Sequence, residues 1–275
     1  MGTAKVEGVW QRDGSSRIFV YKSIPHYCID FVSPRRTYTV TEFKACAMHA
    51  IKDIVRRGKM PILVGGTGFW IDALVYNVNL PEVAPNTRLR KNLEKQSRAE
   101  LFSLLKSLDP ERAKTVEPAN PRRLVRAIEI AKSLGIVPRI KKTHLYDVVW
   151  LGLNPPERVL QKRIEKRIRT WTRSTSGDGN IITETKKLLK KRISRKRMRE
   201  FGFEYAAVLT FLEHRITRCQ LVEKLIADSM HYAKRQMRWF KRNQEIFWIQ
   251  DIAKAEKLVT IWLHARIKKR GSYQP

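Results

Sequence analysis

Apolar and polar residues follow two different rhythms along this chain. In residues 1–80, the short apolar runs at 17–20 and 27–32 are typical of strands, whereas residues 41–57 repeat apolar positions at helical spacing. The apolar positions expected on one side of that helix are Phe43, Met48, Ile51 and Val55. The first part of the chain is therefore predicted to mix strands with helices.

From residue 86 to residue 134 the pattern indicates helix almost throughout. Pro81 and Pro85 interrupt the mixed pattern before it. A strand is predicted again at 147–153, and Asn154-Pro155-Pro156 precedes a further helix. A helical block between two αβ segments indicates an insertion into an α/β core. The expected domains are a first part of the core at 1–80, a helical insertion at 81–142 and a second part of the core at 143–275.

The C-terminal part combines a polar linker, a basic segment and a long helix. Residues 172–182 are largely polar, and residues 186–199 then contain nine Lys or Arg in fourteen positions without an acid. Such a segment is either a solvated surface or a surface that contacts phosphate groups. Phosphate contact is favoured here, because cations this dense repel one another unless they are neutralised. The helix predicted at 221–248 has an apolar stripe that favours core packing, and its basic residues lie off that stripe. The stripe consists of Val222, Leu225, Ser229, Ala233, Gln236 and Phe240.

Composition narrows the class of protein. The chain has 275 residues, 43% of them apolar, which is enough for one large or two modest domains. Its net charge is +30, from 56 Lys and Arg against 26 Asp and Glu. That imbalance costs self-repulsion unless the partner is a polyanion. Nucleic acid is favoured over a membrane, because no Lys-rich face stands opposite a bulky apolar stripe.

Cysteine usage and hydropathy bear on the compartment. Cys28, Cys46 and Cys219 are widely spaced and include no Cys-x-x-Cys pair, which argues against a disulfide framework or a structural zinc site. No apolar run is long enough to span a bilayer, and no secretory start is present. We therefore expect a cytoplasmic protein without a membrane partner.

The most specific local signal is a glycine-rich turn. The apolar run at 60–64 predicts a buried strand, and Thr67 is placed to cap a helix that starts at about Phe69. The glycines of the turn are Gly65, Gly66 and Gly68. A strand, such a turn and a helix N-terminus together favour anion binding, because unpaired N–H groups point at one place. A tight connection without a ligand is the alternative interpretation.

The neighbours of the turn resemble those of the tRNA dimethylallyltransferases, also called isopentenyl transferases. After the turn, Phe69, Trp70, Ala73 and Leu74 match the aromatic or aliphatic pair and the Ala-Leu of that family. Further blocks match in the same order: Gly2-Thr3-Ala4-Lys5; Pro25-His26-Tyr27-Cys28-Ile29-Asp30 with Tyr38 and Phe43; Asp109-Pro110 with residues 121–129; and Tyr232-Ala233-Lys234-Arg235-Gln236-Met237-Arg238-Trp239-Phe240. The blocks span almost the whole chain.

The resemblance implies a fold and a reaction. The fold is α/β, with a P-loop-kinase-like parallel sheet core and a helical insertion domain that grips the anticodon arm of tRNA. The reaction transfers a dimethylallyl group from dimethylallyl diphosphate to N6 of adenosine 37, with a magnesium ion (Mg2+) accompanying the diphosphate. We expect the partners to be tRNA and dimethylallyl diphosphate, and the chain to be a monomer.

One departure from the family pattern is large. Members open with a phosphate-binding P-loop and an Asp-Ser strand end whose Asp is the proposed base, but no Gly-x-x-x-x-Gly-Lys-Ser/Thr occurs in these 275 residues. The expected core therefore has its first strand and P-loop missing. A start placed too late, a truncated gene and a chain that has lost activity all remain open.

The resemblance also assigns residues. Thr67 and Arg167 are the expected catalytic residues, with Gly65 and Gly66 also at the substrate. The expected tRNA contacts are Thr67, Arg88, Arg122, Arg123, Leu124, Val125, Arg126, Arg199, Glu200, Phe201, Gly202, Phe203, Glu204, Lys234 and Arg235. Phe203 stands where the family has a Tyr, and is expected to stack near the reacting base. His26 is expected to be a structural hydrogen-bonding residue and not an acid or base.

Two other functions compete with this hypothesis. A catalytically dead tRNA-binding remnant of the family would keep the charge and the insertion without the P-loop. A nucleotide kinase or NTPase is the third possibility, against which the missing Walker sequence and the Ala-Lys-Arg-Gln signature both argue.

Overall fold

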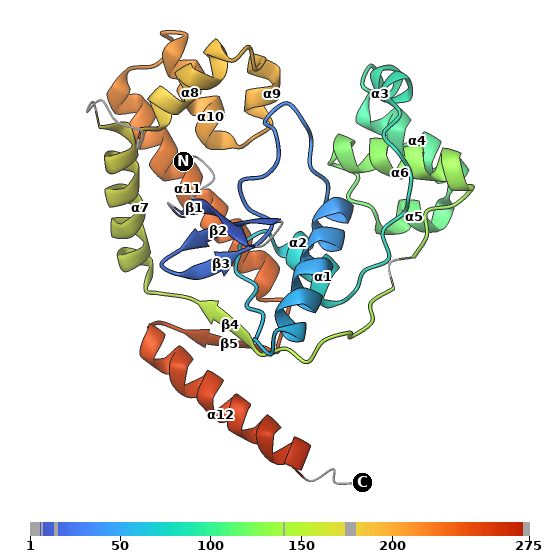
Figure 1. The fold of residues 1–275 in the computed structure, drawn as a ribbon. Helices are drawn as coiled ribbons and strands as arrows, with labels where there is room; N and C mark the ends of the chain where they lie inside the picture. The colour runs from blue at the N-terminus through green and yellow to red at the C-terminus, as the bar shows by residue number, and fades with distance from the viewer. Residues whose placement is uncertain (1–5, 7, 14–15, 140, 174–179, 272–275) are drawn as a thin grey trace. The chain divides into compact units, whose positions relative to one another are not determined.

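The computed structural model of the chain describes residues 6, 8–13, 16–139, 141–173 and 180–271 (Figure 1). The Gly2-Thr3-Ala4-Lys5 block and most of the expected linker at 172–182 lie outside the described residues. The chain divides into two compact units. The helical unit is Asp72–Leu145, and the sheet unit combines Met1–Ile71 with Tyr146–Pro275.

The sheet unit opens with three antiparallel strands, β1 (Val9–Asp13), β2 (Ser16–Tyr21) and β3 (Ile24–His26). Phe19 is buried and stands opposite His26 in the β2–β3 pair. His26 Nδ1 lies 2.9 Å from the carbonyl oxygen of Ile24, which gives this residue the structural role expected for it. The strand predicted at 17–20 is therefore confirmed.

The strand predicted at 27–32 is wrong. These residues form bends, because Cys28 and Asp30 adopt φ values of 55° and 53°. A left-handed backbone cannot continue an extended strand. Helix α1 (Val40–Arg56) follows where it was predicted, and a capping box between Thr39 and Glu42 fixes its start.

A second sheet pairs two strands that are far apart in sequence. Strand β4 (Trp150–Leu153) runs parallel to β5 (Ile246–Ile249), with Trp150 opposite Ile246. The strand expected at 147–153 is thus present in shorter form. The helix expected to reach Trp248 ends at Phe240, and Asn243 lies in the turn that follows, where its side chain accepts a hydrogen bond from the Glu245 N–H at 2.9 Å.

The parallel sheet expected as the core is limited to these two strands among the described residues. The apolar run at 60–64 forms no strand, and Ile62 and Val64 are 82% and 86% exposed. A parallel strand is held by a hydrogen-bonded neighbour, and no described segment pairs with this run. The predicted buried strand is therefore wrong for this structure, while the α/β class is confirmed.

Helices form the main core of the sheet unit. Helices α7 (Glu157–Thr172), α8 (Ile181–Lys190), α10 (Phe203–Leu212) and α11 (Arg218–Phe240) share one apolar cluster. Its fully buried members include Ile168, Ile181, Val208, Leu221 and Leu225. The short helix α9 (Arg195–Arg199) rests on a second cluster with Met198. Helix α12 (Ile252–Gly271) follows β5.

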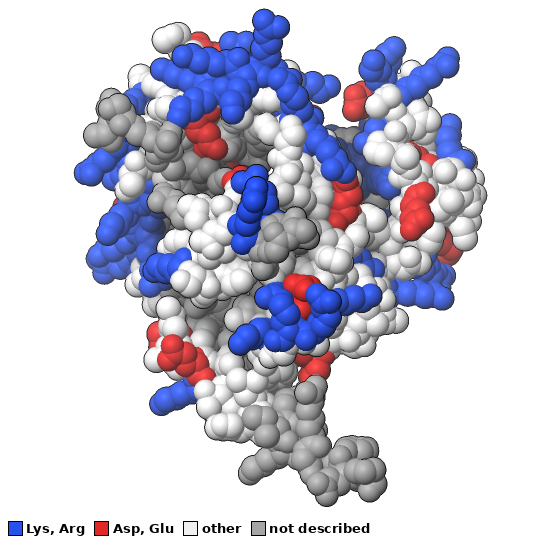
Figure 2. Space-filling model, viewed as in Figure 1, with Lys and Arg blue, Asp and Glu red and all other residues white. Residues whose placement is uncertain are grey.

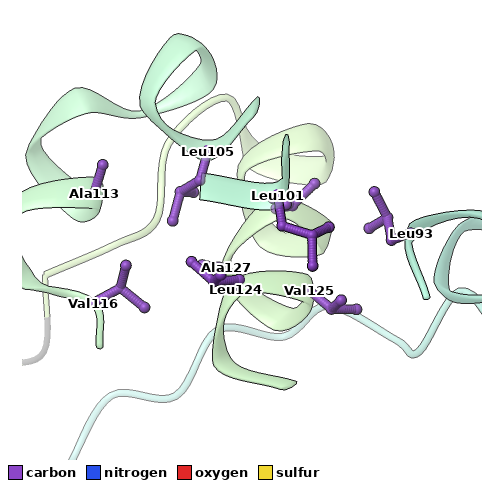
Figure 3. Close-up of a cluster of buried hydrophobic side chains, with 9 residues drawn as sticks. Leu93, Leu101, Leu105, Ala113, Val116, Leu124, Val125 and Ala127 are labelled. Atoms are coloured by element: carbon purple, nitrogen blue, oxygen red, sulfur yellow. The ribbon is translucent and has the colours of Figure 1, made fainter. Parts of the chain in front are cut away.

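The helical unit is built from α3 (Thr87–Leu93), α4 (Arg98–Leu108), α5 (Pro110–Thr115) and α6 (Pro121–Leu134). Each helix is preceded by an N-cap residue whose side chain accepts a hydrogen bond from a backbone N–H of the first turn. These residues are Asn86, Ser97, Asp109 and Asn120. Leucines and small aliphatic residues from all four helices meet in one cluster (Figure 3). Helix α2 (Gly68–Val75) crosses from the sheet unit into this one.

Candidate functional site

The glycine-rich turn is held by helix α11. The Trp70 N–H donates to the Thr67 carbonyl oxygen at 2.9 Å, which opens α2. Gln236 Nε2 donates to the Gly66 carbonyl oxygen at 2.9 Å. The Ala-Lys-Arg-Gln signature and the turn therefore meet in space although they are 170 residues apart.

Close approach to α11 explains two of the glycines. A Cβ on Gly68 would lie 2.1 Å from Cδ1 of Trp239, a rigid ring that has little room to shift. A Cβ on Gly66 would lie 1.9 Å from Gln236 Nε2 and would displace the hydrogen-bonding amide. Glycine is thus favoured where the side chains of α11 pack against the backbone of the turn, most strongly at Gly68 beneath the Trp239 ring.

The outer side of the turn remains open. Gly65 and Thr67 are exposed, whereas Gly68 is buried beneath them. The first N–H groups of α2 have no partner within the helix and carry the positive end of its dipole. Helix starts of this kind, with a hydroxyl group beside them, are places where proteins can bind phosphate groups.

Arg167 is exposed on α7, with its guanidinium 4.9 Å from the centre of the Trp171 ring. An acid from another element acts on Arg167: the Glu204 carboxylate at the start of α10 interacts with it electrostatically. Burial raises the pKa of Glu204, while Arg167 acts in the opposite direction. The spacing of residues along α7 could not reveal this carboxyl group, because Glu204 belongs to α10.

An aromatic pair lies beside the signature helix. The Phe203 and Tyr232 ring centroids are 6.1 Å apart, and the Arg235 guanidinium lies 5.5 Å from the Tyr232 ring. Lys234 is exposed and pairs with Glu157 at 3.5 Å. Tyr232 was not among the expected site residues, although its position one helical turn before Gln236 could have indicated it.

The other residues of the segment at 199–204 are engaged internally. Arg199 donates to Glu213 at 3.1 Å, and Glu200 accepts from Arg197 at 2.8 Å. Phe201 packs against the cluster that contains Met198. Gly202 precedes the first residue of α10.

The expected RNA contacts of the helical unit divide into three kinds. Leu124 and Val125 are buried, so their side chains support the core. Arg126 and Arg90 both bind Glu129, which is 2% exposed. Arg123 pairs with Glu117 at 2.8 Å. Among the described residues no acid pairs with the two other exposed arginines, Arg88 and Arg122.

The fold is that of an α/β protein with a strongly basic composition and an exposed glycine-rich turn at the start of a helix. The chain belongs to the IPP transferase family, which matches residues 16–243.

Relatives and solved structures agree. A tRNA dimethylallyltransferase of Anoxybacillus flavithermus is 32% identical over 232 residues, covering 82% of this chain and 73% of that protein. The corresponding protein of Halothermothrix orenii is 34% identical over 235 residues, covering 82% and 70%. The crystal structure of a tRNA isopentenylpyrophosphate transferase from Bacillus halodurans is 28% identical with a TM-score of 0.62, covering 90% of this chain and 80% of that one.

A more distant solved structure, a eukaryotic dimethylallyltransferase acting on tRNA, shares the fold. Its TM-score is 0.65 at 21% identity, over 92% of this chain and 67% of that one. In the described part of the chain, no helix combines the length and apolar character needed to cross a bilayer.

Proposed function

We propose that this chain is a tRNA prenyltransferase that moves a dimethylallyl group from dimethylallyl diphosphate to N6 of adenosine 37. The observation that carries the proposal is the hydrogen bond between Gln236 and Gly66, which joins the signature helix to the anion-binding turn. The family membership and the names of the relatives support the same reaction.

The chemistry explains why such a site is needed. Adenine N6 is a weak nucleophile, because its lone pair is delocalised into the ring. The new bond joins N6 to the first carbon of the allyl group, and the C–O bond to the diphosphate breaks with its electron pair going to oxygen. N6 loses one proton. The enzyme must therefore orient N6 and stabilise a leaving diphosphate.

Thr67 and Arg167 are assigned to the leaving group. The exposed hydroxyl of Thr67 lies at the start of α2, where N–H groups can share the negative charge that develops on the diphosphate. The exposed guanidinium of Arg167 offers paired donors to phosphate oxygens and stays charged at any relevant pH. Gly65 and Gly66 place their backbone next to the same diphosphate.

The tRNA is assigned to the basic surfaces of both units. In the helical unit, Arg88 and Arg122 are exposed and pair with no acid of the described ranges; in the sheet unit, Arg235 lies beside the aromatic pair. The target base has to leave its stack to be reached. Phe203 and Tyr232 give it aromatic surface on which to rest.

A magnesium ion with the diphosphate belongs to the proposal through the family resemblance alone. The described residues contain no group of three or more His, Cys, Asp or Glu side chains that could hold a metal ion. Such an ion would take most of its ligands from the diphosphate and water.

The direct test is transfer in vitro. The full chain is incubated with tRNA and radiolabelled dimethylallyl diphosphate. The tRNA is then digested to nucleosides, which are identified by mass spectrometry. We expect N6-dimethylallyladenosine from tRNA with adenosine 37 and none from the same tRNA with guanosine 37. Binding of tRNA without transfer would favour the RNA-binding alternative. The absence of both binding and transfer would refute the proposal.

A further inference from the structure

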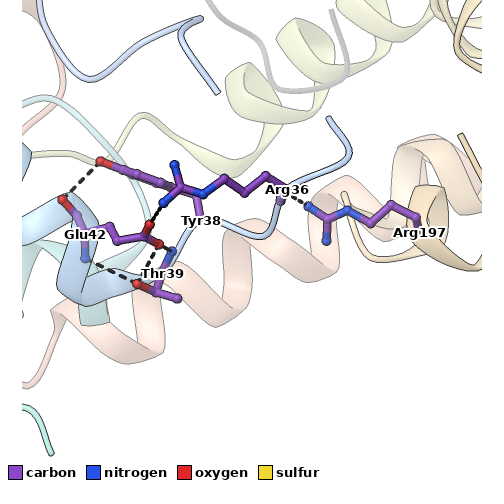
Figure 4. Close-up of polar contacts among 5 residues, drawn as sticks. All are labelled: Arg36, Tyr38, Thr39, Glu42 and Arg197. Atoms are coloured by element: carbon purple, nitrogen blue, oxygen red, sulfur yellow. Dashed lines mark hydrogen bonds and ion pairs between the residues drawn. The ribbon is translucent and has the colours of Figure 1, made fainter. Parts of the chain in front are cut away.

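One guanidinium fastens a loop of the sheet unit to helix α9. Arg197 Nε donates to the Pro34 carbonyl oxygen at 3.1 Å, and its Nη2 donates to the Arg36 carbonyl oxygen at 2.5 Å. Its Nη1 binds Glu200 at 2.8 Å, and the group lies 5.0 Å from the Phe201 ring. The bond to the Arg36 carbonyl spans 161 residues of sequence (Figure 4).

The same loop is fixed at its other end by α1. Arg36 forms an ion pair with Glu42, and the Glu42 carboxylate also accepts from the Thr39 N–H at 2.8 Å in the capping box of α1. Tyr38 donates to the Glu42 carbonyl oxygen at 3.0 Å. The loop that carries Arg35 is therefore held between two helices (Figure 4).

Arg35 is directed to the end of α8. Its Nη2 donates to the Lys191 carbonyl oxygen at 2.6 Å, where α8 ends. A cation is favoured at the C-terminus of a helix by the helix dipole. One donor is used in this way, and the exposed guanidinium keeps further N–H groups for another partner.

The surface around Arg35 is strongly basic. Among the described residues, no acid pairs with the exposed cations of the α8–α9 turn: Lys190, Lys191, Arg192 and Lys196. Glu213 forms ion pairs with Arg195, Arg199 and Arg215, and so it pairs with none of these four cations. Figure 2 shows Lys and Arg gathered over the region of α8 and α9.

The apolar residues of this segment face inward. Leu188, Leu189, Ile193 and Met198 belong to the cluster beneath α9. An amphipathic membrane-binding segment also inserts apolar side chains beside its cations, and the apolar side chains of this turn are used in the core. A charged backbone without an apolar phase is the better fit.

Resting on the proposed function, we propose that the loop at 33–36 and the α8–α9 turn form one contact surface for the phosphodiester backbone of the bound RNA. Arg35 is the contact that the loop adds, and Arg197 is the positioning residue that keeps the loop in place. The surface lies outside the turn at 65–68 and the aromatic pair.

The test measures tRNA binding by fluorescence anisotropy between about 50 and 200 mM salt. Arg35→Ala should weaken binding and reduce the slope of log K against log salt by about one. Arg197→Lys keeps the charge but cannot bridge two carbonyls and a carboxylate, so it should lose as much as Arg35→Ala. The double variant should be no weaker than Arg35→Ala alone, because Arg197 acts through the loop.

Arg56→Ala is the matched control. It removes one charge from the last turn of α1, at the opposite end from the loop, about 25 Å away at 1.5 Å per residue. Its salt slope should equal that of the unaltered chain, and thermal unfolding should show that all variants are folded.

Three results would overturn the inference: an unchanged slope for Arg35→Ala, normal binding by Arg197→Lys, or additive losses in the double variant. Preferential binding to vesicles of phosphatidylcholine and phosphatidylserine, lost in Arg35→Ala while tRNA binding persists, would assign the surface to membranes. Failure of the unaltered chain to bind tRNA at all would instead contradict the proposed function.

Discussion

The helical unit and the sheet unit bury their apolar residues in different ways. In the helical unit, Leu101 and Leu105 of α4 meet Leu124 and Ile128 of α6, and all four are fully buried or nearly so. In the sheet unit, the apolar run at 60–64 stays largely exposed, and the turn after it is held by Gln236 from the other end of the chain. Neighbouring helices can complete a core locally, whereas a strand and a binding turn depend on distant partners.

The largest expected effect tests the completeness of the helical core. Leu105→Ala should lower the free energy of unfolding by about 2–5 kcal/mol, because it leaves a cavity at a fully buried position. Ile62→Ala, at an 82% exposed position of the sheet unit, should change it by less than about 0.5 kcal/mol. Urea denaturation of both variants measures the difference. Equal losses would mean that the run at 60–64 is packed in solution.

The next effect concerns catalysis in the sheet unit. Arg167→Ala should lower turnover about 10²–10³-fold with little change in tRNA affinity, because the charge it stabilises develops only as the C–O bond breaks. Arg167→Lys should restore it only partly. Steady-state kinetics at saturating tRNA measures this, with Arg163→Ala on the same helix as the control. Normal turnover in Arg167→Ala would make Arg167 a solvated surface residue.

Thr67→Ala, like Arg167→Ala, should lower turnover. The hydroxyl is exposed at the start of α2, so its loss should lower kcat and leave the fold intact. A change confined to tRNA affinity would move Thr67 from the diphosphate to the RNA. The same kinetic series, run alongside Arg167→Ala, distinguishes these outcomes.

A smaller effect should appear as pH dependence of the helical unit. Burial alone would raise the pKa of Glu129, but hydrogen bonds from Arg90, the Asn86 N–H and Arg126 outweigh it and lower the pKa. A carboxyl with a lowered folded-state pKa contributes stability above its unfolded pKa of about 4.3, and loses it as pH falls through the folded value. Glu129→Gln should lower stability at pH 7 and flatten this acid-side loss in thermal unfolding. An unchanged pH profile would exclude Glu129 as its source.

The smallest effect separates free from paired arginines in the helical unit. Arg122→Ala should reduce the salt slope of tRNA binding by about one, because this guanidinium has no acid partner among the described residues. Arg123→Ala should change it less, since Glu117 already neutralises Arg123. A larger effect at Arg123 would reverse this order and indicate that RNA displaces Glu117.

Much of the fold could be predicted from local pattern. The position of α1 was predicted from apolar spacing, and residues 86–134 were predicted to be helical, although not their division into α3 to α6. The errors arose where local pattern was overruled. Non-glycine residues with positive φ interrupt the strand predicted at 27–32, and α11 ends at Phe240, before the helical pattern does.

The site was predictable only in part. The turn at 65–68 and Arg167 were proposed from the sequence, whereas the contact of Gln236 with Gly66 and the interaction of Glu204 with Arg167 are tertiary. Helical periodicity could have separated Leu124 and Val125 from the exposed arginines, because they fall on the buried face of α6. Motif resemblance groups residues by sequence and does not distinguish faces.

The hydrogen bond from Gln236 to Gly66 also means that the turn cannot be held in place until residue 236 has been synthesised. The turn leaves the ribosome 170 residues before its partner. At about 5–20 residues per second, roughly 10–30 s pass before α11 can close on it. During that interval the turn and the apolar run before it are exposed to chaperones and proteases, and a nascent chain stalled before residue 236 lacks the residue that holds the turn.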